Sequence, residues 1–155
     1  MLKAEQITNW ILSKVDYDKG DSMSPLKLQK LLYYCQGWYL AVIGDKLFEE
    51  DLQAWAHGPV VPSEYYRFED IKRYDSIPKE RISDEPPIFK GEAKDILEEV
   101  FDVYNEHSAS YLENLTHQEK PWVEARKGVK PFEISTNPIS TETMKSFFKS
   151  HLKNG

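Results

Sequence analysis

The segment SPLKLQKLLYYCQGWYLAVIG, residues 24–44, carries the strongest structural signals in the chain. Ser24 followed by Pro25 favours a helix start, because a serine hydroxyl caps free backbone N–H groups and proline has no N–H to leave unpaired. Gly44 suits the left-handed residue that follows a helix end. Apolar residues follow the 3.6-residue period and also spread over the other sides of the cylinder. We therefore expect a central helix that other elements cover on most of its surface.

Cys35 lies within this segment, among apolar and aromatic neighbours. A reactive thiol needs an electropositive and partly exposed setting, so we expect a buried structural thiol and not a nucleophile. As the only cysteine of the chain, it has no partner for an internal disulfide, which fits a reducing compartment.

Helical spacing and capping signals predict further helices on both sides of the central one. The predicted ranges are 3–17, 63–74 after Pro62, 93–104, a segment through Leu115 that starts at Ser108 or Ser110, a short helix from Pro121 to Gly128, and a C-terminal helix capped by Ser140. Ser110 with Glu113 matches a capping box, and Ile139 with Met144 matches a hydrophobic staple. Residues 75–91 contain three prolines and many charges, so a surface loop is expected there.

Two short runs follow the central helix, KLFEE at 46–50 and DLQAWA at 51–56. The alternation in the second run is typical of a half-buried strand, and the two runs together predict a small antiparallel pair between the second and third helices. The expected fold class is therefore mainly α, of the α+β type: a compact helical domain with one small β element. A length of 155 residues fits a single domain that spans 1–155.

Composition and charge argue against two classes of function, nucleic-acid binding and membrane insertion. The formal net charge of −6 opposes nucleic-acid binding, which depends on clustered Lys and Arg. No stretch approaches the roughly 20 apolar residues that cross a bilayer, and the N-terminal MLKAEQITNWIL lacks the apolar core of a secretory signal. We expect a cytoplasmic protein with no membrane partner. Acidic residues gather in 84–106 and basic ones in 120–155, which indicates either solvated helix faces or an acidic surface that steers a basic partner.

The stretch AWAHGPVVP, residues 54–62, contains a tryptophan, a histidine and a Gly-Pro pair, so it is a candidate functional site. We expect a shaped corner in which Gly58 and Pro59 turn the chain from strand to helix, Trp55 anchors the turn, and His57 pairs with freed backbone groups. The four histidines lack zinc-ligand spacing, and phosphate-binding and nucleophile-elbow motifs are absent from the sequence. The sequence thus predicts no catalytic residue, no metal and no cofactor.

Aromatic residues are dense for a chain of this length, and large rings are enriched at protein contacts. Most belong to the core. Tyr34 and Tyr66 lie off the main stripes of their helices, so we expect both at the surface as candidate partner-binding residues.

Three separated motifs resemble one family in order along the chain. MSPLKLQKLLYYCQGWYLAVIGDKLFEEDLQAWAHGPVVPSEYYRF closely resembles the opening of the Panacea domain, also called the SocA-like antitoxin domain, of bacterial and prophage-associated proteins. LENLTHQEKPWVEAR resembles the family's Leu-Thr-His and Pro-Trp segment, and PISTETMKSFF resembles its closing helix. The resemblance covers roughly residues 4–148, and it implies that His117, Pro121 and Trp122 complete the same corner as His57.

The resemblance implies a cytoplasmic, non-catalytic type II antitoxin that binds and neutralises a cognate toxin protein, usually encoded by an adjacent gene. Two alternatives stay open. One is a proteolytic adaptor that delivers the toxin to an ATP-dependent protease, as in one branch of the family. The other is a small enzyme that uses His57 or His117 with a carboxylate. The oligomeric state, the toxin and the binding face stay open as well.

Overall fold

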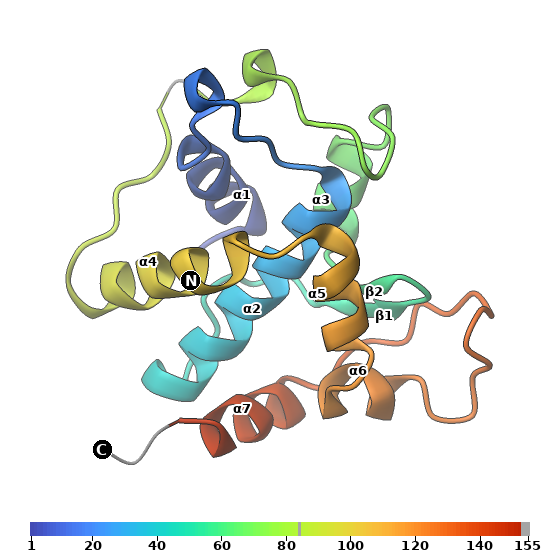
Figure 1. Cartoon of the computed structure of the whole chain (residues 1–155). Coiled ribbons are helices and arrows are strands. Elements are labelled where there is room, and N and C mark those ends of the chain that lie inside the picture. The colour runs from blue at the N-terminus through green and yellow to red at the C-terminus, as the bar shows by residue number, and fades with distance from the viewer. Residues whose placement is uncertain (84, 153–155) are drawn as a thin grey trace.

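The central element of the fold is the helix α2 (Pro25–Ile43), as Figure 1 shows. In the computed structural model, which describes residues 1–83 and 85–152, other helices pack on several sides of α2. These are α1 (Ala4–Ser13), α3 (Pro62–Arg67), α4 (Gly91–Asn105), α5 (Ala109–Thr116) and α7 (Thr141–Ser150). The expected fold class, mainly α with a small β element, is confirmed.

The ends of α2 follow their sequence signals. The Ser24 hydroxyl accepts a hydrogen bond from the Lys27 N–H at 3.2 Å, and Gly44 adopts a left-handed φ of 96° with its N–H on the Leu40 carbonyl. Cys35 is buried, as predicted, and burial raises the pKa of its thiol to about 12. At neutral pH this thiol is therefore protonated and shielded from solvent.

The β element is a two-stranded antiparallel hairpin of β1 (Gln53–Trp55) and β2 (Gly58–Val60), in which Trp55 pairs with Gly58. The predicted pairing was therefore wrong in one strand, because residues 46–50 contribute only an isolated bridge between Leu2 and Phe48. The left-handed φ of 107° at Gly58 lets the chain reverse immediately after His57. The Gly-Pro pair consequently lies inside the second strand, and Pro62 begins α3.

Several local predictions needed correction. α3 ends at Arg67 and does not continue to residue 74. The Ser108 hydroxyl accepts from the Tyr111 N–H at 3.1 Å, so Ser108 caps α5 and the predicted Ser110 capping box is wrong. α6 spans Lys120–Ala125, and residues 75–90 contain a single 3-10 turn, Lys79–Arg81, among the positions described.

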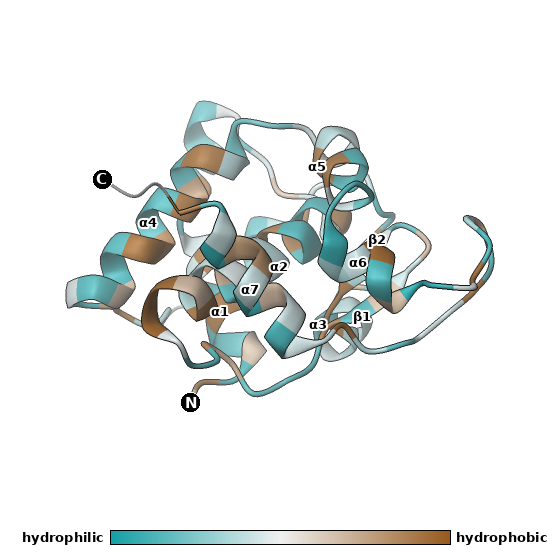
Figure 2. Cartoon of the chain, turned by 90° about the horizontal axis from the view of Figure 1, so that it is seen from below, coloured by the Kyte–Doolittle hydropathy of each residue, from teal (hydrophilic) through white to brown (hydrophobic). Residues whose placement is uncertain are grey.

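α7 closes the core against α2. Its N-cap is Ser140, whose hydroxyl accepts from the Thr143 N–H, and the predicted staple residues Ile139 and Met144 are both buried. The ring of Phe148 lies where a Cβ on Gly37 would be, so the two helices approach closely at that glycine. Hydrophobic and hydrophilic residues alternate along α4, which packs one side on α2 (Figure 2).

A long loop between α6 and α7 projects away from the helices on the side of the hairpin (Figures 1 and 2). Phe132 and Ile134 in this loop are more than nine-tenths exposed. In the part of the chain that the structure describes, none of the helices has the length and apolar character needed to cross a bilayer.

Candidate functional site

The residues of AWAHGPVVP and of the downstream Thr-His and Pro-Trp motifs meet in one place, which we call the hairpin corner. It comprises the hairpin and the side chains that pack on it: Trp55, His57, Gly58, Pro59, His117, Pro121 and Trp122. The indole N–H of Trp122 donates to the Trp55 carbonyl at 2.8 Å, and the His117 ring stacks on Trp122 with centroids 4.1 Å apart. The structure thus brings together motifs that are about 60 residues apart in sequence.

Local sequence places Trp122 for this contact. Pro121 occupies the first turn of α6, where its missing N–H costs nothing, and it is buried. Arg126 follows α6, is 5% exposed, and donates to the Ala54 carbonyl at 2.9 Å. The sequence prediction missed Arg126, because arginine side chains are ordinarily expected at the surface.

His57 binds two side chains, not the backbone groups that we expected. Its Nδ1 lies 3.2 Å from Glu113 Oε1, and its Nε2 lies 2.7 Å from a guanidinium nitrogen of Arg73. Arginine can only donate and a carboxylate only accepts, so these partners assign the hydrogen to Nδ1 and leave Nε2 as the acceptor. His57 is half-exposed, and both of its nitrogens are engaged.

His117 sits deeper than His57. It faces the Ala56 backbone, and its Nε2 is buried with no hydrogen-bond partner among the described residues. Burial lowers the pKa of His117 below its usual value of 6.5, so the ring is neutral at physiological pH. A neutral ring stacked on Trp122 is a packing element of the corner.

Lys30 lies on α2, and its fully buried side chain contacts the hairpin. Its ammonium group donates to the Pro59 carbonyl at 3.0 Å, and burial lowers the pKa of Lys30 to about 7. A Cβ on Gly58 would lie 2.8 Å from the Lys30 side chain and 2.9 Å from the Thr116 hydroxyl, so only glycine fits both the space and the φ angle. Sequence analysis missed Lys30, because a lysine on a helix is ordinarily solvated.

Tyr33, Tyr34 and Glu119 form a second buried polar cluster. The Tyr33 and Tyr34 hydroxyls both donate to Glu119, at 3.0 Å and 3.2 Å, and burial raises the pKa of this carboxyl to about 7. Tyr34 has no exposed surface and stacks on Tyr104 with centroids 3.9 Å apart. The expectation that Tyr34 contacts a partner at the surface is therefore wrong, because α4 and α5–α6 residues cover that side of α2.

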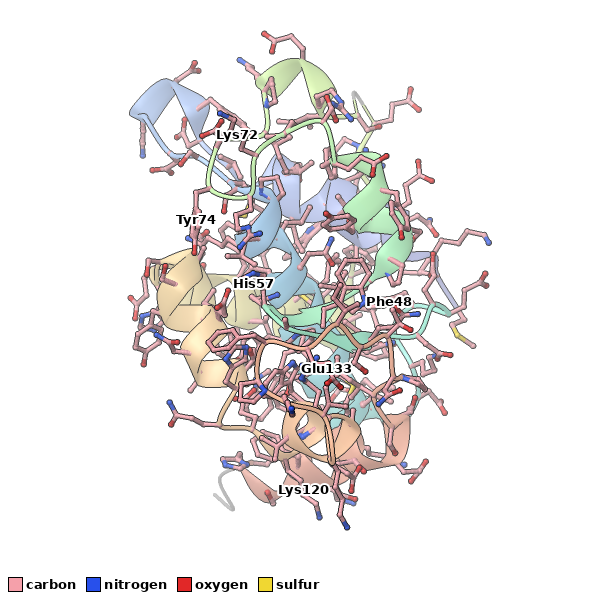
Figure 3. All side chains as sticks on the ribbon, turned by 90° about the vertical axis from the view of Figure 1, so that its right-hand side faces the viewer. Phe48, His57, Lys72, Tyr74, Lys120 and Glu133 are labelled. Carbon is pink, nitrogen blue, oxygen red and sulfur yellow. The ribbon has the colours of Figure 1, made fainter. Side chains whose placement is uncertain are left out.

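The surface beside the hairpin corner is hollowed into a groove of about 550 Å³, which we call the corner groove. Trp55, Tyr65 and Tyr66 line it as successive edge-to-face pairs, with centroids 4.8 Å and 5.4 Å apart. Tyr66 is 59% exposed, in agreement with its predicted place at the surface. Figure 3 views this side, with His57 between the segment of Lys72 and Tyr74 and the loop of Glu133.

The remaining lining of the corner groove combines charge with apolar surface. Charged and polar members are Gln29, His57, Glu69, Lys72, Arg73, Ser135 and Thr136, and apolar ones are Pro25, Leu26, Ala56, Val60, Phe68, Ile71 and Ile134. Volumes of 300 to about 1,000 Å³ with such mixed linings are typical of ligand sites. Another hollow of about 360 Å³, between α2 and α4, is mainly apolar and lies away from the corner.

The side chains of the corner are held in place by packing and hydrogen bonds to one another and to the backbone. Lys30 does not line the groove, and both nitrogens of His57 are held by neighbours. Within residues 1–83 and 85–152, no group of three or more His, Cys, Asp or Glu side chains is arranged to hold a metal ion. The groove instead presents aromatic rings and cations to solvent.

The fold is thus mainly helical, with a hairpin that distant side chains brace and an aromatic groove beside it. The family model described as antitoxin SocA-like, Panacea domain, matches residues 28–123, more than half of the chain. The chain therefore belongs to this antitoxin-like family, and the matched segment contains every residue of the hairpin corner. Searches of curated proteins and of solved structures returned no match.

Proposed function

We propose that this chain is an antitoxin of a type II toxin–antitoxin system, which neutralises a toxin protein by binding it directly in the cytoplasm. The toxin is the product of an adjacent gene, and residues 1–155 act as one domain. Membership of an antitoxin-like family supports a protein partner. The observation that carries the proposal is the corner groove, which is lined by three aromatic rings that all belong to the family's matched segment.

The aromatic rings of the groove are held in place before a partner binds, which favours protein binding. Tyr65 and Tyr66 are 40% and 59% exposed, yet Tyr65 is held edge-on between Trp55 and Tyr66. Rings that are already fixed lose little side-chain freedom on binding, so more of their contact energy appears as affinity. A stable complex buries about 800 Å² per partner, so the partner must contact surface beyond the groove itself. The exposed Phe132 and Ile134 extend the apolar surface beside it.

We further propose that the domain has no catalytic role. A general base must be able to take a proton from a substrate, whereas His57 Nε2 already accepts from Arg73, and His117 Nε2 is buried. The imidazoles and indoles of the corner brace one another. We also propose that the corner residues maintain the fold and that Tyr66 contacts the partner.

The decisive experiment is co-expression with the protein encoded by the adjacent gene. Restored growth together with co-purification of a stoichiometric complex is the expected result. Continued toxicity, with no complex on size-exclusion chromatography, would overturn direct neutralisation. A toxin half-life that shortens only when this chain and an ATP-dependent protease are both present would identify a proteolytic adaptor instead.

A further inference from the structure

Two adjacent cations, Lys72 and Arg73, line the corner groove. Lys72 and Arg73 are exposed residues on the groove wall, and neither lies within salt-bridge distance of a carboxylate in residues 1–83 and 85–152. The chain as a whole carries a net charge of −6, whereas this groove places two adjacent cations beside three aromatic rings.

Three acidic side chains near the groove are paired with other residues. Glu113 binds His57 at 3.2 Å, Asp70 binds Arg81 at 2.9 Å, and Glu64 binds Arg67 at 3.3 Å. Among the groove-lining residues only Glu69 opposes Lys72 and Arg73. Lys72 and Arg73 together with Glu69 give the groove lining a net charge of +1, on a molecule that is negative overall.

Arg73 is also oriented by the corner. One of its terminal nitrogens donates to His57 Nε2 at 2.7 Å, which fixes the guanidinium at the groove while its other N–H groups have no partner in the described part of the chain. A guanidinium has five N–H donors in a planar fork that suits a carboxylate. A held fork beside aromatic rings is a preorganised receptor for an acidic group flanked by apolar side chains.

We propose that the corner groove binds a partner-protein segment in which an Asp or Glu carboxylate, held by Arg73 and Lys72, is flanked by apolar side chains that pack on Trp55, Tyr65 and Tyr66. This deepens the proposed function and rests on it, since the groove is taken as the surface that meets the toxin. The net charge of −6 repels a uniformly acidic protein, so the recognised acid is a local feature of a partner that is neutral or basic overall.

The test uses a random dodecapeptide display library as its probe, so it does not require the toxin. The library is panned on the full-length chain, and individual peptides are then measured against K72E/R73E and against K94E/K120E. The control pair makes the same change in net charge at exposed lysines elsewhere, and Figure 3 shows Lys120 far from Lys72. Thermal melting of K72E/R73E, together with the single variant Lys72→Glu, which leaves the Arg73–His57 bond intact, separates loss of binding from loss of folding.

Enriched peptides are expected to carry Asp or Glu among apolar residues, and K72E/R73E should weaken their binding by about tenfold or more, because charge-assisted hydrogen bonds are lost. K94E/K120E should bind within about twofold of the parent chain, because distant exposed charges are screened by salt. Enrichment of peptides without acids, equal binding to both double variants, or no enrichment at all overturns the inference.

The adjacent-gene toxin then separates this inference from the proposed function. If the toxin binds the parent chain and K72E/R73E equally, neutralisation stands and the groove assignment falls. If the toxin binds neither, the proposed function falls, and the peptide result alone decides what the groove recognises.

Discussion

The indole Nε1–H of Trp122 donates to the backbone carbonyl of Trp55 at 2.8 Å, across 67 positions of sequence. This bond joins α6 to β1, and the neighbouring Arg126 makes a parallel contact with the Ala54 carbonyl. The hairpin is too short to be stable alone, because an isolated two-stranded hairpin is marginal in water. Its shape, and that of the groove beside it, therefore depends on side chains from the second half of the chain.

Replacement of Trp122 by Phe should show this dependence. The variant retains an aromatic ring against His117 but leaves the Trp55 carbonyl without its donor, so we expect a loss of about 1 to 3 kcal/mol in the free energy of unfolding. Urea denaturation followed by circular dichroism measures it. Val123→Ala is the control, because Val123 is the next residue of the same helix and is 49% exposed. Equal stability of the two variants would contradict the bracing role.

Gly58→Ala adds a single methyl group, yet it should destabilise the fold strongly. The variant meets both a left-handed φ of 107° and close contacts with Lys30 and Thr116, so a cost of about 2 to 4 kcal/mol is expected. Gly20→Ala is a matched control, since Gly20 has a φ of 88° with open space around its Cβ position, and it should cost only about 1 kcal/mol. Thermal melting that shows the same loss for both would mean that the close approach of Lys30 is unimportant.

Local sequence signals predicted the elements that local physics controls. The Ser24–Pro25 start and Gly44 end of α2 and the Ser140 cap each depend on residues within a few positions of one another. The central position of α2 follows from the apolar residues on most sides of that helix. Tyr34 was misplaced because its burial depends on Tyr104 and Glu119, which arrive from distant helices.

The site was harder to predict than the helices. The meeting of His57 with Trp55, His117 and Trp122 was expected from family resemblance, whereas Lys30, Glu113, Arg73 and Arg126 were missed. Each of the missed residues is a charged side chain whose partner lies far away in sequence. No periodicity or capping pattern marks such a residue, because a buried or paired charge and a solvated one look alike in sequence.

The buried Lys30 makes a pH prediction with a definite sign. Its pKa falls from 10.5 in the unfolded chain to about 7 in the fold, so between these values the unfolded chain binds more protons. Stability should therefore rise with pH in this window, by up to about 1.4 kcal/mol per pH unit, and Lys30→Met should remove that slope. Urea denaturation from about pH 7 to about pH 9 tests this. The exposed Lys94→Met variant should keep the parent's slope, and a parent without any slope would refute the prediction.

The buried Glu119 should make stability fall as the pH rises, which is opposite to the effect of Lys30. Burial raises its pKa from 4.5 to about 7, so between these values the folded chain binds more protons than the unfolded one. Stability contributed by the protonated carboxyl is present below pH 4.5 and is lost as the pH rises to 7. Glu119→Gln keeps an acceptor for the Tyr33 and Tyr34 hydroxyls without titrating, so it should gain stability relative to the parent as the pH rises. The exposed Glu99→Gln variant should run parallel to the parent over the same range.

Tyr66→Ala tests the binding role of the corner groove. Tyr66 is 59% exposed, so truncation should change the melting temperature little, whereas a buried interface tyrosine typically contributes about 2 kcal/mol, or more than tenfold in Kd. Calorimetric titration with the adjacent-gene toxin, together with growth rescue, measures the effect. Tyr111→Ala is the matched control, because Tyr111 is 50% exposed and stacks on His107, outside the residues that line the groove. If both variants bind the toxin as the parent does, the toxin contacts another face of the molecule. If only Tyr111→Ala loses affinity, the binding surface lies around α5.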